Sequence, residues 1–318
     1  MIKAYITGIC GFAGSWLAEE LTAHGYNVAG AALPHESDIH VRQIRPAIKI
    51  DRFDITNLNA CKKIIGKRKP DYLFHLAAFA SVGQSFAEGE KVFEVNVNGT
   101  GNILKAVCGK KWLRKIICVS SSDIYGPIKK ADLPLKPTQL FNPVSPYAQS
   151  KAAAEYLIKV YGENYGIPIT VVRPFNHTGP RQCANFVIPA FCNKIIKAEI
   201  SGGKTPVSVG NLDARRDISD VRDIVRGYRM IAERGTVGET YHLCSGKAFR
   251  IGDLLKKLIS FSDINIKVQK DIKLLRKTDI PVLRGSYFKT RKETGWKPEI
   301  TIDKTLRDSL DYRRKASQ

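Results

Sequence analysis

The sequence predicts an α/β protein, with a Rossmann-type doubly wound parallel sheet and a smaller, discontinuous α/β region. Three observations lead to this prediction. Short apolar segments alternate with longer amphipathic ones through the first half of the chain, a glycine-rich loop follows the first apolar segment, and the alternation ends after Pro174. Such alternation is typical of parallel strands that are wrapped by helices.

The alternation places the elements in order along the chain. We expect strands near residues 3–7, 27–33, 47–51, 72–77, 115–120 and 169–174. Apolar residues recur at helical spacing between these strands, which predicts helices at residues 12–24, 56–67, 87–108 and 146–164. Ser145 and Pro146 suit the N-cap and first position of the last of these. Two later helices are expected at residues 186–200 and 220–235, the second capped by Asp220.

Composition excludes several classes of protein. The 318-residue chain is 43% hydrophobic and 25% charged, which is ordinary for a soluble globular protein. No apolar run has membrane-spanning length, and the apolar start of the chain is broken by three glycines and lacks a small-residue cleavage site. We therefore expect a cytoplasmic protein with no membrane partner. The seven cysteines are scattered without a C-x-x-C pair, so we expect neither disulfides nor a metal site.

The net charge is less ordinary. There are 51 Lys and Arg residues against 30 Asp and Glu, which gives a formal charge of +21 and favours anionic partners. The basic residues form separate clusters, such as residues 62–69, 109–115 and 270–277, without a run interleaved with aromatic residues. We expect a solvated basic surface, and a nucleic-acid partner is not expected.

The stretch TGICGFAG, residues 7–14, lies between the first strand and the first helix. Gly8, Gly11 and Gly14 allow a tight turn, close approach to a pyrophosphate and packing of helix on strand, while the start of the helix supplies N–H groups. The spacing is G-x-x-G-x-x-G. In this context it predicts a dinucleotide site, to which Phe12 and Ala13 of the same loop contribute.

The sequence gives less information on the residues that contact the adenosine of the cofactor. The second strand ends with residues 31–35, AALPH, which place neither an acid nor an arginine at its tip. The cofactor is therefore NADP(H) or NAD(H), and we expect NADPH to be accepted at least as well as NADH because no acid repels a 2′-phosphate. Asp54, after the third strand, is placed either to contact adenine or to cap the next helix.

A tyrosine and a lysine share one face at the start of the 146–164 helix. In VSPYAQSK, residues 144–151, Tyr147 and Lys151 are four positions apart. By themselves they could be an exposed tyrosine beside a surface lysine. However, Ser121 follows the fifth strand in VSSSDIYG, at the carboxyl end of the sheet where ligands of open α/β folds bind.

With TGxxGFxG, SSxxYG and YxxxK in this order, essentially the whole chain resembles the extended short-chain dehydrogenase/reductase family that acts on nucleotide sugars. The resemblance implies an NAD(P)-dependent oxidoreductase. In it, Tyr147 exchanges a proton with a sugar hydroxyl or ketone, Ser121 binds the same oxygen, and Lys151 holds the nicotinamide ribose. Lowering the pKa of a tyrosine from about 10 to about 7 takes roughly 4 kcal/mol, part of which the Lys151 ammonium can supply.

The resemblance implies further contacts and a partner. Relatives pair through two long helices, so we expect a homodimer formed by residues 87–108 and 146–164. The cofactor contacts beyond the glycine loop are expected at Ile55, Leu76, Ala77 and Ala78.

The second half resembles a narrower group. Residues 173–182, 209–225, 275–286 and 294–298 look like the reductases of GDP-4-keto-6-deoxy-D-mannose, which form GDP-D-rhamnose. The GDP-mannose 4,6-dehydratases are near relatives. This resemblance implies a GDP-sugar substrate. By the same resemblance the expected substrate-binding residues are Asn176, Arg181, Val187, Arg216, Arg276 and Asp279. The arginines and Asp279 suit these roles, because buried phosphates need forked donors and a ribose diol needs an acceptor.

Structural alternatives remain for these residues. Arg216 could pair with a neighbouring acid, Asn176 could cap a turn, and Arg276 could be solvated. The chain also reads Arg276-Lys277-Thr278-Asp279 where the family usually has R-P-x-E, and the shorter acid puts the ribose contact of Asp279 in doubt.

Two related reactions and one unrelated function compete with 4-ketone reduction. Dehydratases of this family carry a threonine at the position of Ser121 and a glutamate at that of Asp123, so the chain disfavours dehydration, although Asp123 stays a candidate catalytic residue. A nucleotide-sugar 4-epimerase would use the same Ser121, Tyr147 and Lys151. An RNA-binding or scaffolding protein on a dehydrogenase fold is the alternative from another class, but it would have been free to lose these side chains.

The change of pattern after Pro174 predicts two domains. We expect a dinucleotide-binding domain made of residues 1–175 together with about 214–237, and a sugar-nucleotide-binding domain made of residues 176–213 and 238–318.

Overall fold

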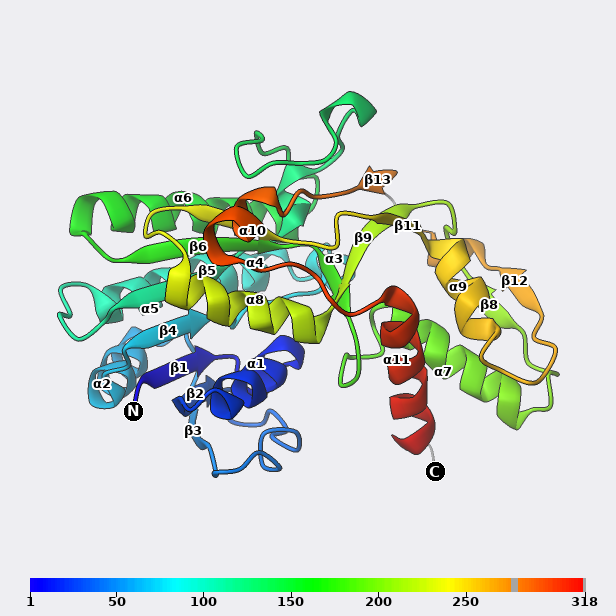
Figure 1. Ribbon diagram of the computed structural model, residues 1–318, viewed down its shortest axis with the longest axis horizontal. Helices are drawn as coiled ribbons and strands as arrows, with labels where there is room; N and C mark the ends of the chain where they lie inside the picture. Colours follow the sequence, from blue (N-terminus) through cyan, green and yellow to red (C-terminus); the bar gives the residue numbers. More distant parts are fainter. Residues whose placement is uncertain (276–279, 317–318) are drawn as a thin grey trace.

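The computed structural model describes residues 1–275 and 280–316. A parallel sheet forms its centre, with the strand order β10-β6-β5-β4-β1-β2-β3 (Figure 1). The strands are β1 (Lys3–Thr7), β2 (Asn27–Ala32), β3 (Lys49–Arg52), β4 (Tyr72–His75), β5 (Lys115–Val119), β6 (Ile169–Pro174) and β10 (Thr240–Leu243). The predicted fold class and the strands expected in the first half are confirmed.

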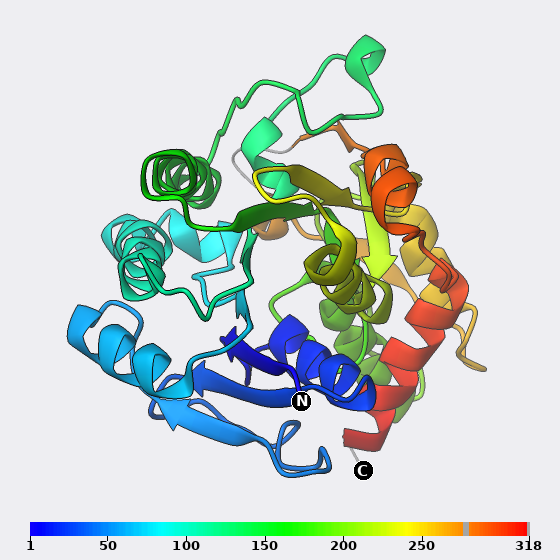
Figure 2. The same cartoon turned by 60° about the vertical axis from the view of Figure 1, so that its left-hand side comes forward.

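Helices cover both faces of this sheet because side chains alternate along each strand. Ile6 and Phe74 point to one face and pack with α1 (Phe12–Ala23) and α8 (Val221–Arg234). The neighbouring residues Tyr5 and Leu73 point to the other face, which is covered by the helices seen on the left of Figure 2, namely α2 (Leu58–Arg68), α5 (Thr100–Val107) and α6 (Pro146–Tyr165).

The helix predicted at residues 87–108 is confirmed over residues 89–107, with a π-helical turn inside it that the sequence did not predict. The chain forms α3 (Val82–Ser85), α4 (Gly89–Phe93), a π-helical turn at Glu94–Gly99, and then α5. The Thr100 hydroxyl donates a hydrogen bond to the carbonyl of Asn96 inside the π turn (2.6 Å). Side-chain bonds of this kind compete with the regular helical ladder, and π turns often occur at functional sites.

The second half of the chain builds a smaller region around its own core (Ile195, Leu255 and Leu306 among others). Its strands are β7 (Asn176–Thr178), β9 (Arg215–Asp220), β11 (Ala248–Arg250) and β13 (Val282–Leu283) in one sheet, and β8 (Val207–Val209) with β12 (Val268–Lys270) in another. Its helices are α7 (Val187–Ile200), α9 (Ile251–Ile259) and α11 (Ile302–Ala316). Short 3-10 turns occur at Ser122–Tyr125, Lys130–Asp132 and Ile272–Leu274.

One strand connects the late part of the chain to the large sheet. Strand β10 pairs with β6, and α10 (Phe288–Thr294) packs on β10 and α8. This strand covers an edge of β6 that would otherwise be unpaired, although it lies in residues 238–318, the range expected to belong to the second domain. The division of the chain into two domains stays a prediction.

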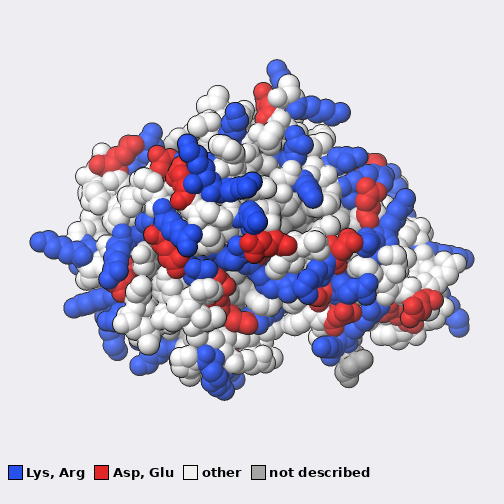
Figure 3. Space-filling view, in the orientation of Figure 1, with Lys and Arg blue, Asp and Glu red and all other residues white. Residues whose placement is uncertain are grey.

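The surface charge is spread widely. On the face shown in Figure 3, blue Lys and Arg side chains are distributed over the whole width of the molecule and alternate with red Asp and Glu. Within the described residues, we find no helix with the length and apolar character that membrane crossing requires.

Candidate active site

Three polar side chains expected to carry the chemistry are buried together at the carboxyl end of the sheet. Helix α6 begins as predicted, since the Ser145 hydroxyl accepts a hydrogen bond from the N–H of Ala148 (3.1 Å) and Pro146 is its first residue. Tyr147 is 8% exposed, Lys151 9% and Ser121, which follows β5, 8%. The tyrosine and lysine are therefore not the exposed surface pair that the sequence left open.

The surroundings of Tyr147 favour its protonated form. Burial raises the pKa of the Tyr147 phenol above its ordinary value of about 10, and the negative charge of Asp123 raises it further. A hydrogen bond with Ser121 acts in the opposite direction. Without a ligand, Tyr147 is thus a phenol at neutral pH, which is the form that can donate a proton.

Lys151 is held by the strand beneath it. Its ammonium donates a hydrogen bond to the carbonyl of Val119, the last residue of β5 (2.8 Å). Burial lowers the pKa of Lys151 to about 8, and the carboxylate of Glu155, one helical turn further on, opposes this shift. This hydrogen bond to β5 orients the Lys151 ammonium before any cofactor is bound.

The glycine loop has the geometry of a phosphate cradle. Gly8 has a φ of +72°, and a Cβ atom placed on it would lie 3.0 Å from the backbone of Ala77. A Cβ on Gly14 would lie 2.0 Å from the carbonyl oxygen of Gly8. Helix α1 starts after Gly11 without a side-chain cap and without an acid in its first turn, so its N–H groups and positive dipole suit an anionic ligand.

The other expected cofactor residues follow strands β3 and β4. Leu76, Ala77 and Ala78 follow β4, which is the neighbour of β1 in the sheet. Ile55 is buried (5% exposed), whereas Asp54 is exposed and accepts a hydrogen bond from the N–H of Thr56 (2.9 Å). Asn57 caps α2 by accepting from Ala60 (3.0 Å), so the helix-cap interpretation of Asp54 is wrong. Its contact with adenine stays a prediction.

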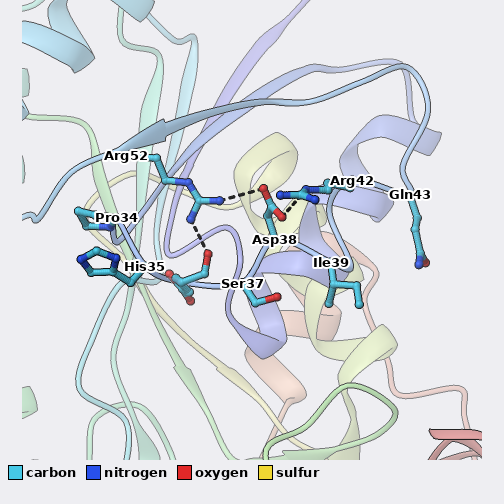
Figure 4. Close-up of a pocket in the computed structure, with 9 residues that line it drawn as sticks. Pro34, His35, Ser37, Asp38, Ile39, Arg42, Gln43 and Arg52 are labelled. Atoms are coloured by element: carbon cyan, nitrogen blue, oxygen red, sulfur yellow. Dashed lines mark hydrogen bonds and ion pairs between the residues drawn. The ribbon is translucent and has the colours of Figure 1, made fainter.

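An acid and an arginine approach the tip of β2 from outside the strand. A cavity of about 540 Å³ lies there, lined by residues 34–39, 42, 43 and 52 (Figure 4). The Glu36 carboxylate accepts from the N–H of Leu33 (3.3 Å), and a Cβ on Gly11 would lie 4.0 Å from its Oε1. Arg52, at the end of β3, donates to the carbonyl of Leu33 (3.0 Å).

Asp38 neutralises the arginines of this cavity. Its carboxylate pairs with Arg52 (2.8 Å) and with Arg42 (2.5 Å), as Figure 4 shows. Glu36 and Asp38 are the acids that a preference for NADH would bring onto the ribose, and they follow the AALPH segment directly in the sequence. Arg52 was not among the expected cofactor residues, and no local pattern pointed to it.

The residues expected to bind substrate lie partly on adjacent strands. Strands β7 and β9 are parallel, with Asn176 aligned to Ile218. Since residues two apart on a strand share a face, Asn176 and Arg216 project from the same face of this sheet. The Arg216 guanidinium donates to the carbonyls of Arg215 (3.0 Å) and Ile280 (2.5 Å). Val187 is the first residue of α7. Arg276 and Asp279 lie outside the described residues.

Arg181 is placed against the helix that follows the glycine loop. Its guanidinium lies 3.9 Å from the ring centroid of Trp16 and pairs with Glu19 of α1 (2.7 Å). Its φ of +75° is uncommon for a residue with a side chain. The contact of Arg181 with substrate stays a prediction. In residues 1–275 and 280–316, no group of three or more His, Cys, Asp or Glu is arranged to hold a metal ion.

Comparisons with known proteins agree with this arrangement. A family model described as GDP-mannose 4,6 dehydratase matches residues 5–309. The GDP-6-deoxy-D-mannose reductase of Pseudomonas aeruginosa is 31% identical over 308 residues, which are 97% of this chain and 96% of that protein.

Two solved structures have the same fold. The structure of RMD from Pseudomonas aeruginosa complexed with NADPH has a TM-score of 0.87 and 30% identity, and the match covers 99% of this chain and 100% of that one. The UDP-glucose 4-epimerase of Thermus thermophilus in complex with NAD has a TM-score of 0.88 and 25% identity, with 99% and 100% covered.

The glycine loop makes a prediction about cofactor binding. In Gly11→Val we expect the affinity for NADH and NADPH to fall by about 100-fold or more, because the side chain would cover the N–H groups that bind the pyrophosphate. Calorimetric titration measures the affinity, and circular dichroism checks the fold. Gly66→Val is the control, since a Cβ on Gly66 has no neighbour within 4 Å. Normal affinity in a folded Gly11→Val protein would show that the loop does not hold the cofactor.

Proposed function

The chain belongs to the epimerase/dehydratase family of extended short-chain dehydrogenases/reductases, and within this family we propose a specific reaction for it. The family model for GDP-mannose 4,6 dehydratase covers residues 5–309. The protein is an oxidoreductase that uses NAD(H) or NADP(H). We propose that it reduces the C4 ketone of GDP-4-keto-6-deoxy-D-mannose to GDP-6-deoxy-D-mannose (GDP-D-rhamnose). The observation that carries the proposal is a buried Ser121–Tyr147 pair in which the phenol is held protonated.

The protonation state favours the reductive direction. A bound reduced nicotinamide would supply a hydride to C4, which would leave the carbonyl oxygen as an alkoxide. Because an alkoxide is more basic than a phenolate, Tyr147 can protonate it without a lowered pKa. Ser121 orients this oxygen, and Lys151 stabilises the phenolate that remains. An enzyme that first oxidises a hydroxyl instead needs Tyr147 as a base, and burial and Asp123 both disfavour the phenolate.

Substrate recognition is proposed for the smaller sheet. Asn176 and Arg216 project from one face of neighbouring strands, where an amide and a guanidinium suit the two phosphates of GDP. We propose that the large sheet binds the dinucleotide and that this smaller region binds the GDP-sugar, with Val187 at the start of α7 beside it.

Dehydration and 4-epimerisation are the second candidates. Dehydration is favoured by the description of the family model. Epimerisation is favoured by the fold, because the TM-score to a UDP-glucose 4-epimerase is 0.88. Against dehydration stand Ser121 and Asp123, where the resemblance implies threonine and glutamate in dehydratases. The stoichiometry of the cofactor distinguishes the three reactions.

Tyr147→Phe tests the proposed acid. The substitution keeps the ring and removes the proton, so turnover of GDP-4-keto-6-deoxy-D-mannose should fall by about 10²–10⁴-fold while cofactor affinity stays near normal. Tyr165→Phe on the exposed end of α6 is the matched control and should keep full activity. The wild-type protein should oxidise one equivalent of reduced cofactor for each 4-hydroxy product. Product without net oxidation, or loss of water from GDP-mannose, would rule out the reductase and support the epimerase or dehydratase.

The cofactor preference is proposed to depend on Glu36. The expectation that NADPH is accepted at least as well as NADH assumed that no acid lies at the tip of β2, but the fold returns the Glu36 carboxylate to Gly11. A carboxylate there can accept from the ribose diol of NADH and repels a 2′-phosphate. Asp38 engages Arg42 and Arg52, which would otherwise attract that phosphate. We therefore propose that NADH is preferred.

Glu36→Gln should shift this preference. We expect the ratio of kcat/KM for NADPH to that for NADH to rise about tenfold or more, since like-charge contacts cost on the order of a few kcal/mol. Initial rates with each cofactor measure the ratio, and Glu163→Gln on the exposed surface of α6 is the control. An unchanged ratio would remove Glu36 from the ribose site.

The homodimer also stays a proposal, supported by exposed apolar side chains on the expected helices. Phe93 on α4 is 39% exposed, and Tyr156 and Val160 on α6 are 64% and 46% exposed. Helix α6 contacts both α4 and α5, so these side chains belong to one helical layer. Light scattering should give twice the 35.4 kDa of one chain, and Val160→Glu should give the mass of a monomer. A monomeric wild-type protein at micromolar concentration would contradict the proposal.

A further inference from the structure

A chain of buried polar groups runs beneath the cofactor loop to the catalytic helix. Thr7, at the end of β1, and His75, at the end of β4, are 0% and 4% exposed. Thr100 (4%), at the start of α5, and Asn96 (1%), in the π turn, continue the chain. Buried polar groups are costly unless each one has a partner, so the direction of every hydrogen bond here is constrained.

The Thr100 hydroxyl determines the tautomer of His75. A hydroxyl carries one proton, and Thr100 donates it to the carbonyl of Asn96 (2.6 Å). Towards Nε2 of His75 (3.0 Å) the same oxygen can therefore only accept, which places the imidazole proton on Nε2. Nδ1 is then an acceptor, and the Thr7 hydroxyl donates to it (2.8 Å).

The same assignment satisfies the loop after β4. With its proton given to His75, the Thr7 oxygen accepts from the N–H groups of Leu76 (3.2 Å) and Ala77 (3.1 Å). The next residue after Thr7 is Gly8, on which a Cβ would touch the backbone of Ala77 at 3.0 Å. Thr7 thus joins the glycine loop to a second segment that is expected to contact the cofactor.

The other end of the chain reaches the helix of the catalytic tyrosine. The Asn96 amide donates to the Ser150 hydroxyl (2.9 Å), and its oxygen accepts from the N–H of Phe79 (2.8 Å). Ser150 in turn donates to the carbonyl of Tyr147 (2.8 Å). The π turn is what places both the Asn96 carbonyl and the Asn96 side chain in this chain.

We propose that His75 is a positioning residue which, as the neutral Nε2-protonated tautomer, connects the dinucleotide loop to the π turn and so keeps Tyr147 aligned with the bound cofactor. His75 touches neither substrate nor cofactor in this role. The proposal rests on the proposed function only in taking Tyr147 as the proton donor.

The environment of His75 keeps it neutral. Burial lowers the pKa of the imidazole to about 3, and the Lys151 ammonium acts in the same direction. A second proton on Nδ1 would displace the bond from Thr7, so the arrangement allows one protonation state across the physiological range.

The tautomer can be measured directly. Heteronuclear NMR of imidazole ¹⁵N shifts should show His75 protonated on Nε2 and unprotonated on Nδ1, with no titration between about pH 5 and 8. The His75 signals are identified by their absence in His75→Gln. A proton on Nδ1, or titration within that range, would overturn the proposal. This measurement needs no sugar substrate, so it decides on His75 even if the proposed reduction fails.

Variants of the two threonines test the connection itself. Thr7→Val should weaken NADH binding about tenfold, because it removes the hydroxyl at the end of the chain of hydrogen bonds that lies next to the glycine loop. Thr100→Val should lower kcat about tenfold with cofactor affinity unchanged, because it removes the hydroxyl at the end next to the π turn. Thr100→Ser keeps the hydroxyl and should restore kcat. Thr170→Val is the matched control, since this buried hydroxyl bonds only the Thr236 carbonyl among the described contacts (3.2 Å). Thr100→Val behaving like Thr170→Val, or no rescue by serine, would overturn the proposal.

Discussion

The burial of ionisable side chains on the inner face of α6 is the constraint on which the site depends. Tyr147, Lys151 and Glu155 lie at successive turns of this helix, and each is less than 10% exposed. Such groups can be buried only with partners. Ser121 binds the phenol, the Val119 carbonyl accepts from the ammonium, and Arg173 of β6 binds Glu155 (2.6 Å). All three partners belong to β5, β6 or the turn after β5. These contacts therefore fix both the rotation of α6 about its axis and its position along the sheet.

This constraint also sets the acid–base character of the site. Burial raises the pKa of Tyr147 and lowers that of Lys151 to about 8, so both groups are shifted towards their neutral forms. A neutral phenol next to a lysine that is still largely protonated at pH 7 suits the delivery of a proton to a basic oxygen. The side chain that raises the pKa of Tyr147 further is Asp123, which lies in the short 3-10 turn that Ser121 caps.

Helix α1 also contacts the segment of residues 176–181. Phe12 of the glycine loop stacks on His177, the residue after Asn176, with ring centroids 5.8 Å apart. One turn along α1, the Trp16 indole donates to the carbonyl of Pro180 (3.0 Å). The segment that carries Asn176 is therefore held on the helix that follows the glycine loop. A change in the glycine loop is therefore expected to move the segment of residues 176–181 as well.

The sequence by itself determined the parallel sheet, the glycine loop and the Ser121, Tyr147 and Lys151 set, because apolar alternation, glycine spacing and helical spacing act over a few residues. Only the tertiary structure decided the rest. The return of Glu36 to Gly11, the stacking of Arg181 on Trp16, the strand β10 and the buried chain from Thr7 through His75 to Ser150 join residues far apart in the chain. The π turn is local in sequence, yet its position also depends on distant residues. The Asn96 side chain accepts a hydrogen bond from the N–H of Phe79 and donates one to the Ser150 hydroxyl. Contacts between elements are set by packing and by the need to pair every buried polar group, and a local pattern carries no information on either.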